Sequence, residues 1–191
     1  MFRRQFIARA AALLAGVTFP AISSFAHTPY AQWDVFRKRN LQVLTSHADL
    51  PGDEVGDEWV ALLREKLPLS RAMVSRAHDM PRIAALLKTN QSKLAVLSYM
   101  HARLLFTGSP PFEEYAPLPI EVLVDNGKYL LVTRPDLPLH HGFLIAATLM
   151  QDADRLHLVN PGKGKFGMNV HPGAKAFFNG EKLEMPDKPV E

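Results

Sequence analysis

The chain contains no cysteine. Disulfides, thiolate nucleophiles and cysteine-based metal sites are therefore excluded. Hydrophobic residues make up 47% of the 191 residues. A chain of this length can bury enough apolar surface to fold without covalent cross-links. The sequence thus predicts a domain that is held together by its packed interior alone.

The sequence also lacks the local motifs of common enzymes. It has no Gly-x-Ser-x-Gly for a serine nucleophile, and no His-x-x-x-His or His-Glu-x-x-His for a catalytic metal. The adjacent His140 and His141 would point to different sides of a helix. The segment 162–167, rich in glycine and lysine, lacks the spacing of a nucleotide-binding loop. We therefore expect no enzymatic activity and no cofactor.

The positive net charge of the chain comes from its first residues. The net charge is +3, but Arg3, Arg4 and Arg9 fall within residues 1–26, which contain no acidic residue. The remaining chain is close to neutral. Nucleic-acid binding requires a basic face, so we expect no nucleic-acid partner.

Residues 1–26 are typical of an export signal. Arg3 and Arg4 precede an apolar stretch that runs to Val17, and residues 24–26 include small side chains suited to cleavage. The paired arginines resemble a twin-arginine signal. An uncleaved anchor is the alternative, but a spanning helix needs ~20 predominantly apolar residues and this stretch is shorter. We expect export to a bacterial periplasm, a single α/β domain over residues 27–182, and a loose tail over residues 183–191.

Strands and helices alternate from residue 40 to residue 101. Short apolar and β-branched runs at residues 41–45, 72–75 and 94–98 are separated by segments with helical periodicity. This alternation predicts βαβ units in a three-layer α/β domain with a central, mostly parallel sheet. We expect the flavodoxin-like order, with the first strand between the second and the third, and central strands that begin near Leu41, Ala72, Leu94 and Tyr129.

A hairpin is predicted after the Pro-rich segment that ends at residue 119. Residues 120–124 and 129–133 are strand-like, and Asn126-Gly127 between them favours positive φ. Part of the sheet is therefore expected to be antiparallel.

Polar residues follow the expected strands at their carboxyl ends, where α/β sheets bind ligands. We predict one ligand-binding surface that is flanked by two arginines able to hold a carboxylate. Its residues are Thr45, Ser46, His47, Arg76, Ser98, Tyr99, His101 and Arg134. Two structural alternatives stay open: Thr45 and Ser98 could simply cap the following helices, and the arginines could pair with Asp49, Asp79 or Asp136.

A copper site is a further alternative. Cleavage after Ala26 would place His27 at a free amino terminus, and amine and imidazole nitrogens suit Cu(II). His47 or His101 would complete this site. The spacing of the histidines predicts no other metal site.

The chain resembles a known family in four segments. They are RIAALL at residues 82–87 leading into LAVLS at 94–98, GKYLLVTRPDLP at 127–138, HGFLIA at 141–146 and HPGAKAFF at 171–178. These segments resemble the TAXI-type solute receptors of TRAP transporters, within the type II periplasmic binding proteins. Such receptors have two lobes that close on a solute. The chain between residues 101 and 120 is too short for a second lobe, so the resemblance implies a single lobe.

Two functions follow from these observations. The first is an exported receptor for a small carboxylate-bearing solute, working with a membrane transporter subunit. The second is a non-catalytic interaction module that kept the fold and lost the ligand, with a homodimer as one way to replace the missing lobe. A concave pocket lined by Thr45, Ser98, Tyr99 and Arg134 would favour the first, and an exposed apolar patch would favour the second.

Overall fold

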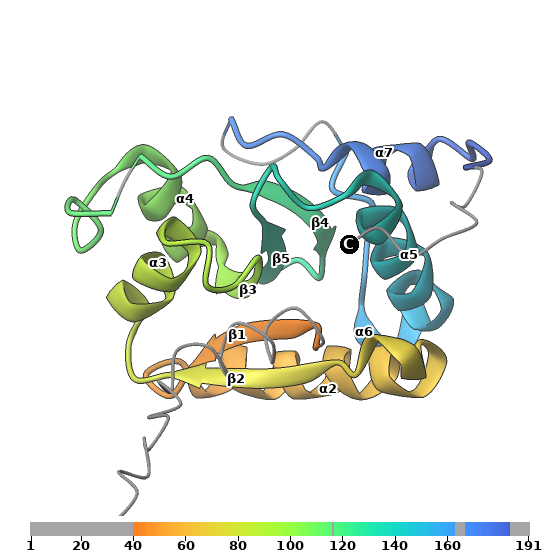
Figure 1. Cartoon of the computed structure of the whole chain (residues 1–191), viewed down its shortest axis with the longest axis horizontal. Coiled ribbons are helices and arrows are strands. Elements are labelled where there is room, and N and C mark those ends of the chain that lie inside the picture. Colours follow the sequence, from red (N-terminus) through yellow and green to blue (C-terminus); the bar gives the residue numbers. More distant parts are fainter. Residues whose placement is uncertain (1–39, 116, 163–166, 184–191) are drawn as a thin grey trace, which may run out of the picture. The chain divides into compact units, whose positions relative to one another are not determined.

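The computed structural model describes residues 40–115, 117–162 and 167–183 (Figure 1), all within the unit formed by residues 33–191. The expected signal, His27 and most of the expected tail lie outside the described residues. The elements are β1 (Gln42–Ser46), α2 (Leu50–Lys66), η1 (Pro68–Ser70), β2 (Met73–Ala77), α3 (Met80–Lys88), β3 (Leu94–Ser98), α4 (Tyr99–Thr107), β4 (Glu121–Asp125), β5 (Tyr129–Thr133), α5 (Leu139–Leu149), η2 (Met150–Asp152), α6 (Ala153–Leu156) and α7 (Pro172–Phe178).

The five strands form one mixed sheet in the order β2-β1-β3-β5-β4. β1 is parallel to both β2 and β3, so the expected place of the first strand is confirmed. β5 is antiparallel to β3 and to β4, which confirms the hairpin. Gly127 in its turn has φ +83°, a value that glycine adopts without strain.

Two expectations for the sheet were wrong. Only two of the four neighbouring pairs are parallel, so the sheet is mixed and not mostly parallel. β2 lies at an edge of the sheet and not at its centre. Both differences follow from the hairpin, because it adds β5 and β4 on the β3 side and leaves the β2 side without a further strand among the described residues.

Helices cover both faces of the sheet, as a three-layer domain requires. Side chains alternate along β1: Val43 packs with α2, α5 and α7, whereas Leu44 packs with α3 and α4. Figure 1 shows α3 and α4 on one side of β3 and β5, and α5 on the other. Trp59 and Leu63 of α2 are fully buried in the first of these two cores.

Three helices begin at the same edge of the sheet. Asp49 and Asp79 follow β1 and β2, and Ser98 is the last residue of β3. The side chains of all three accept hydrogen bonds from backbone N–H groups in the first turns of α2, α3 and α4. None of the described helices is long and apolar enough to cross a membrane.

Helices α5 and α7 approach each other closely around a buried histidine. His171 Nε2 donates to Leu137 O at 3.0 Å, and its Nδ1 accepts from Gly173 N at 3.1 Å. Burial holds the pKa of His171 below its ordinary value, despite the opposing hydrogen bond to Leu137. A Cβ on Gly142 would lie 2.1 Å from His171 Nδ1, so this packing requires glycine. His171 is therefore a structural residue.

Candidate functional site

The chain leaves β1 and β3 toward opposite faces of the sheet. β1 leads into α2, which packs on one face, and β3 leads into α4, which packs on the other. Such a point, where the strand order reverses, is where α/β sheets bind ligands. We define the switch-point edge as residues 45–49, 98–101 and 125–129, which stand together at the carboxyl ends of β1, β3 and β4 and the amino end of β5.

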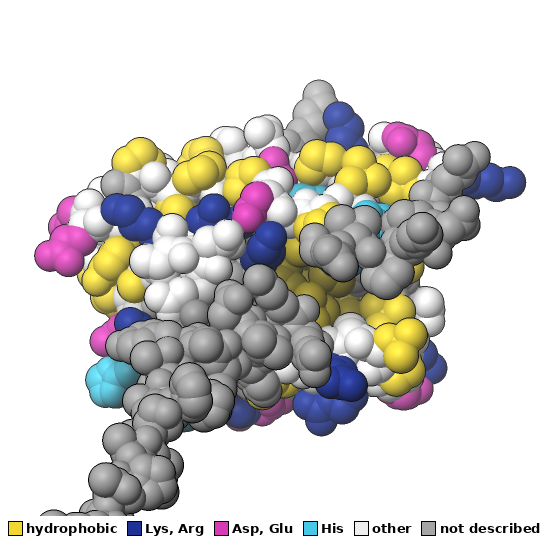
Figure 2. All heavy atoms as spheres, in the orientation of Figure 1, with side chains coloured by type: hydrophobic (Ala, Val, Ile, Leu, Met, Phe, Trp, Pro, Cys, Tyr) yellow, Lys and Arg dark blue, Asp and Glu magenta, His cyan; other side chains and the backbone are white. Residues whose placement is uncertain are grey.

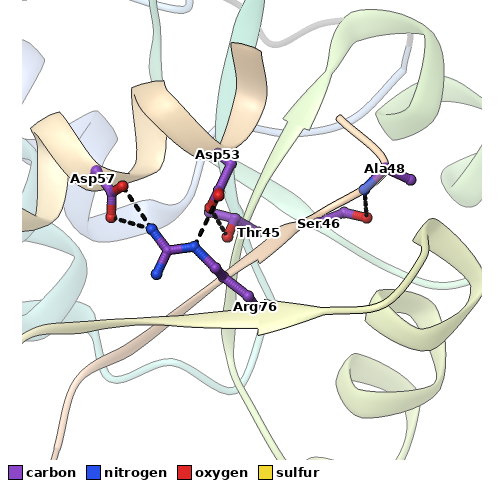
Figure 3. A network of polar contacts seen from close by, with 6 residues as sticks. All are labelled: Thr45, Ser46, Ala48, Asp53, Asp57 and Arg76. Carbon is purple, nitrogen blue, oxygen red and sulfur yellow. Dashed lines mark hydrogen bonds and ion pairs between the residues drawn. The ribbon is translucent and has the colours of Figure 1, made fainter. Parts of the chain in front are cut away.

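Thr45 and Arg76 form an internal network with two carboxylates of α2 (Figure 3). The buried Thr45 hydroxyl donates to Asp53 Oδ1 at 2.6 Å. Arg76 Nε donates to Asp53 Oδ2 at 2.8 Å, and its Nη2 lies 2.6 Å from Asp57 Oδ2. Burial works to raise the pKa of Asp53, but the hydrogen bonds from Thr45 and Arg76 prevail, and that pKa lies below its usual range.

Arg76 is therefore ion-paired with two carboxylates of its own chain. The sequence analysis left open a pairing with an aspartate but named Asp49, Asp79 and Asp136, whereas the structure selects Asp53 and Asp57. These two residues face β2 from the first two turns of α2. The pairing alternative therefore holds for Arg76, with other aspartates than those expected, and its role toward a ligand stays a prediction.

Ser46 and His47 differ in their exposure. Ser46 is buried, and its Oγ accepts from Ala48 N at 3.1 Å, which shapes the loop toward α2. His47 is exposed, and its backbone N–H donates to Ala77 O at 3.0 Å. The imidazole of His47 thus faces solvent beside the end of β1.

Ser98 and His101 form a local pair at the start of α4. Ser98 Oγ accepts from the His101 backbone N–H at 3.3 Å and lies 2.9 Å from His101 Nδ1. The capping alternative for Ser98 is thereby confirmed. The His101 ring meets Phe112 edge-on, with ring centroids 6.4 Å apart. Both side chains are half-buried.

Two tyrosines bracket the end of β3. Tyr99 donates its hydroxyl to Asp125, and Tyr129 donates to Asp49 Oδ1 at 2.8 Å. Tyr99 packs with the α3 and α4 core, whereas Tyr129 packs with the core on the α2 face. Burial, together with the neighbouring carboxylates, raises the pKa of Tyr99 and raises that of Tyr129 to about 12. Both hydroxyls are therefore protonated donors at neutral pH.

The sequence analysis missed Asp49, Asp125 and Tyr129 as members of this edge. Asp125 is fully buried and accepts from Gly127 N at 2.7 Å, in addition to Tyr99. The register that places Tyr129 opposite Ser98 brings it to the edge. The Asn126-Gly127 turn was a usable signal, because it fixes which residues open β5.

Arg134 lies at the opposite end of the sheet. Because β5 runs antiparallel to β3, its last residues stand beside the start of β3, where Arg134 N donates to Lys93 O at 3.1 Å. Its Nε lies 2.9 Å from Asp136 Oδ1, and Nη1 donates to Leu87 O at 2.6 Å. The pairing alternative is confirmed, and the expectation that Arg134 flanks the binding surface was wrong.

The hollow nearest the switch-point edge runs along α4. It has a volume of about 360 Å³ and is lined by Tyr99, Met100, Arg103, Leu104, Thr107 and Ser109. Of the four side chains expected to line a pocket, only Tyr99 contributes to it. Met100 is 60% exposed at its rim. The hollow is open to solvent and partly apolar.

Charges of both signs are mixed over the described surface. On the face shown in Figure 2, lysine and arginine side chains lie among acidic and hydrophobic ones. Within the described ranges no group of three histidine or carboxylate side chains could hold a metal ion. His27, which the copper hypothesis requires, lies outside those ranges.

Comparisons of the chain with protein families, with curated proteins and with solved structures found no match.

Proposed function

We propose that the protein is an exported, non-catalytic binding protein that captures a small solute at the switch-point edge and works with a membrane transporter. The observation that carries this proposal is the placement of β1 and β3. They are parallel neighbours, and the chain leaves them toward opposite faces. This arrangement opens the edge to a ligand between the first turns of α2 and α4.

The two carboxylates of this edge, Asp49 and Asp125, are not exposed, whereas two basic side chains are. His47 and Lys128 are exposed, and Ser98 and His101 are half-buried beside them. Asp49 and Asp125 already accept hydrogen bonds from tyrosine hydroxyls and backbone N–H groups. The positively charged Lys128 supports a solute that carries a carboxylate.

The resemblance to TAXI-type solute receptors supports the same kind of solute. In the single lobe that the resemblance implies, no second domain would close the edge. The solute would therefore stay partly in contact with water, and binding of modest affinity is expected.

Thermal unfolding in the presence of carboxylates and amino acids tests this function. A ligand at 100 times its Kd adds about 2.7 kcal/mol to stability, which raises Tm by roughly 5 to 10 °C for a domain of this size. Lys128→Ala should reduce the shift. The matched control is Lys175→Ala, an exposed lysine on α7. Equal shifts in both variants, or no shift with any ligand, would contradict the proposal.

An interaction module is the second candidate. Met100 is exposed beside Leu104 in a shallow hollow, which suits contact with a protein surface better than enclosure of a solute. The same screen separates the candidates, because a partner surface gives no concentration-dependent shift with small carboxylates. In that case Met100→Glu should weaken binding to a transporter subunit, with Leu69→Glu as the exposed control on η1.

A further inference from the structure

The two edge strands of the sheet, β4 and β2, differ in how their outward backbone groups are covered. At the β4 edge, Val122 N donates to Asn169 O and Val122 O accepts from His171 N, both at 2.9 Å, and Asp125 O accepts from Val159 N at 2.7 Å. A register shift between Val122 and Val124 bends this edge further. Covering segments and bulges are the usual means by which proteins prevent an edge strand from pairing with another chain.

Among the described residues, no β-bulge and no backbone segment covers the β2 edge. Met73 N donates to Leu41 O at 2.9 Å, and Ala77 O accepts from His47 N at 3.0 Å. Because backbone groups alternate in direction along a strand, Met73, Ser75 and Ala77 bond to β1. The polar groups of Val74 and Arg76 therefore point outward, away from the sheet.

The charge on β2 does not block this edge. Arg76 would hinder pairing if its guanidinium stood over the backbone. The guanidinium instead forms ion pairs with two carboxylates of α2, from Nε to Asp53 Oδ2 at 2.8 Å and from Nη2 to Asp57 Oδ2 at 2.6 Å (Figure 3). β2 also contains no proline and no lysine. One end of the edge is closed, since Ala72 O accepts from Arg64 Nε at 3.3 Å.

We propose that β2 pairs antiparallel with β2 of a second copy of this chain, so that two sheets join into one. A two-fold axis through Ser75 places Val74 opposite Arg76 of the second copy, and each of these residues then donates and accepts one main-chain hydrogen bond. The strand is self-complementary in this register. Each copy supplies the two outward-facing residues that the other copy needs.

Charge also favours the second copy as the occupant. In this register Arg76 faces Val74 and not another arginine, so like charges are not directly opposed. Each guanidinium brings its own two carboxylates to the interface. The aliphatic part of Arg76 would cover the partly buried Val74 side chain of the other copy.

Sedimentation equilibrium of the full chain without ligand tests this proposal separately from solute binding. Over roughly 1 to 300 μM, the average mass should rise toward twice the monomer mass. Val74→Pro removes an outward N–H without removing a bond to β1, and proline is tolerated at such edge positions. It should weaken dimerisation by a factor of about ten or more.

Val74→Lys is the second variant, in case proline disturbs the strand. It places a lysine opposite Arg76 of the second copy and should weaken the dimer by like-charge repulsion. Leu69→Lys also introduces a lysine, at a residue of η1 that is 95% exposed, and should leave the dimer unchanged.

Three results would overturn the proposal. The first is a wild-type chain that stays monomeric over the whole range. The second is a dimer that both Val74 variants leave intact, because another surface would then hold it together. The third is slow hydrogen exchange of the Val74 amide in a monomeric sample, because a segment of the same chain would then cover the edge.

Discussion

The Tyr129 hydroxyl donates to Asp49 Oδ1 at 2.8 Å, which joins two residues 80 positions apart. Asp49 also caps α2 by accepting from Gly52 N at 3.2 Å. One carboxylate thus fixes the start of α2 and ties it to the first residue of β5. The loop after β1 is therefore positioned both by β1 and by the hairpin of β4 and β5.

Tyr129→Phe removes this hydroxyl and leaves the ring in place. We expect a loss of about 1 kcal/mol of unfolding free energy, because the Asp49 carboxylate keeps its bond to Gly52 but loses a donor. Urea denaturation measures it. Tyr115→Phe is the control, because the Tyr115 hydroxyl has no hydrogen bond to a described residue. Equal losses in the two variants would show that the Tyr129 bond contributes nothing.

Asp53→Asn weakens the network of Thr45 and Arg76. The amide can accept from only one of these two donors with its oxygen, and it leaves the partly exposed Arg76 with Asp57 alone. We expect a loss of about 1 to 2 kcal/mol, discounted for the solvent around Arg76. Asp57 is 55% exposed, and Asp57→Asn should cost about 0.5 kcal/mol or less. Chemical denaturation that ranks Asp57→Asn as the more damaging would contradict this account.

His171 should make the protein sensitive to mild acid. Its folded pKa lies below the ordinary value of 6.5, so the unfolded chain binds a proton more readily than the folded one. The stability is complete above pH 6.5 and falls as pH drops from there to the lower folded pKa. Urea midpoints between pH 8 and pH 5 measure this slope.

Two variants isolate the contribution of His171 to that slope. His171→Asn keeps a side chain that can cap α7 and should flatten the pH dependence. His78→Gln changes a histidine that is 94% exposed and should not. The pKa of His141 is also lowered, by burial and then by His140 and Lys93, so part of the slope will remain in His171→Asn. An unchanged slope in that variant would mean that His171 does not carry it.

Gly142→Ala should destabilise the protein although alanine is the better helix former. The added Cβ would lie 2.1 Å from the His171 ring, which has little room to move because both of its nitrogens are bonded. Overpacking of this kind costs about 1 to 3 kcal/mol, against a gain of about 1 kcal/mol in helix propensity. Thermal unfolding measures the balance. A higher Tm for Gly142→Ala would show that α5 and α7 separate easily.

Most of the sheet could be predicted from the sequence, because each strand and turn is marked by residues that are close together in the chain. Each of the first three strands is a short apolar run followed by a capped helix, and Asn126-Gly127 marks the hairpin. Local signals do not show where the hairpin docks. Because the hairpin docks beside β3, the sheet is mixed, and Arg134 lies at the end of the sheet opposite the switch-point edge.

Less of the candidate site than of the fold could be predicted from the sequence. Thr45, Ser98 and Tyr99 were expected at the carboxyl edge and lie there, because strand ends follow directly from strand positions. Their partners were missed. The bonds from Tyr99 to Asp125 and from Tyr129 to Asp49 span 26 and 80 residues, and no spacing rule connects residues so far apart.

The bond between Tyr129 and Asp49 also has a consequence for the order of folding. β1, α2 and β2 can form from neighbouring segments, but the loop at Asp49 gains its last anchor only when β5 docks on β3. Closing so long a loop is entropically costly and comes late. In a nascent chain that ends before residue 129, the switch-point edge would therefore lack its anchor at Asp49.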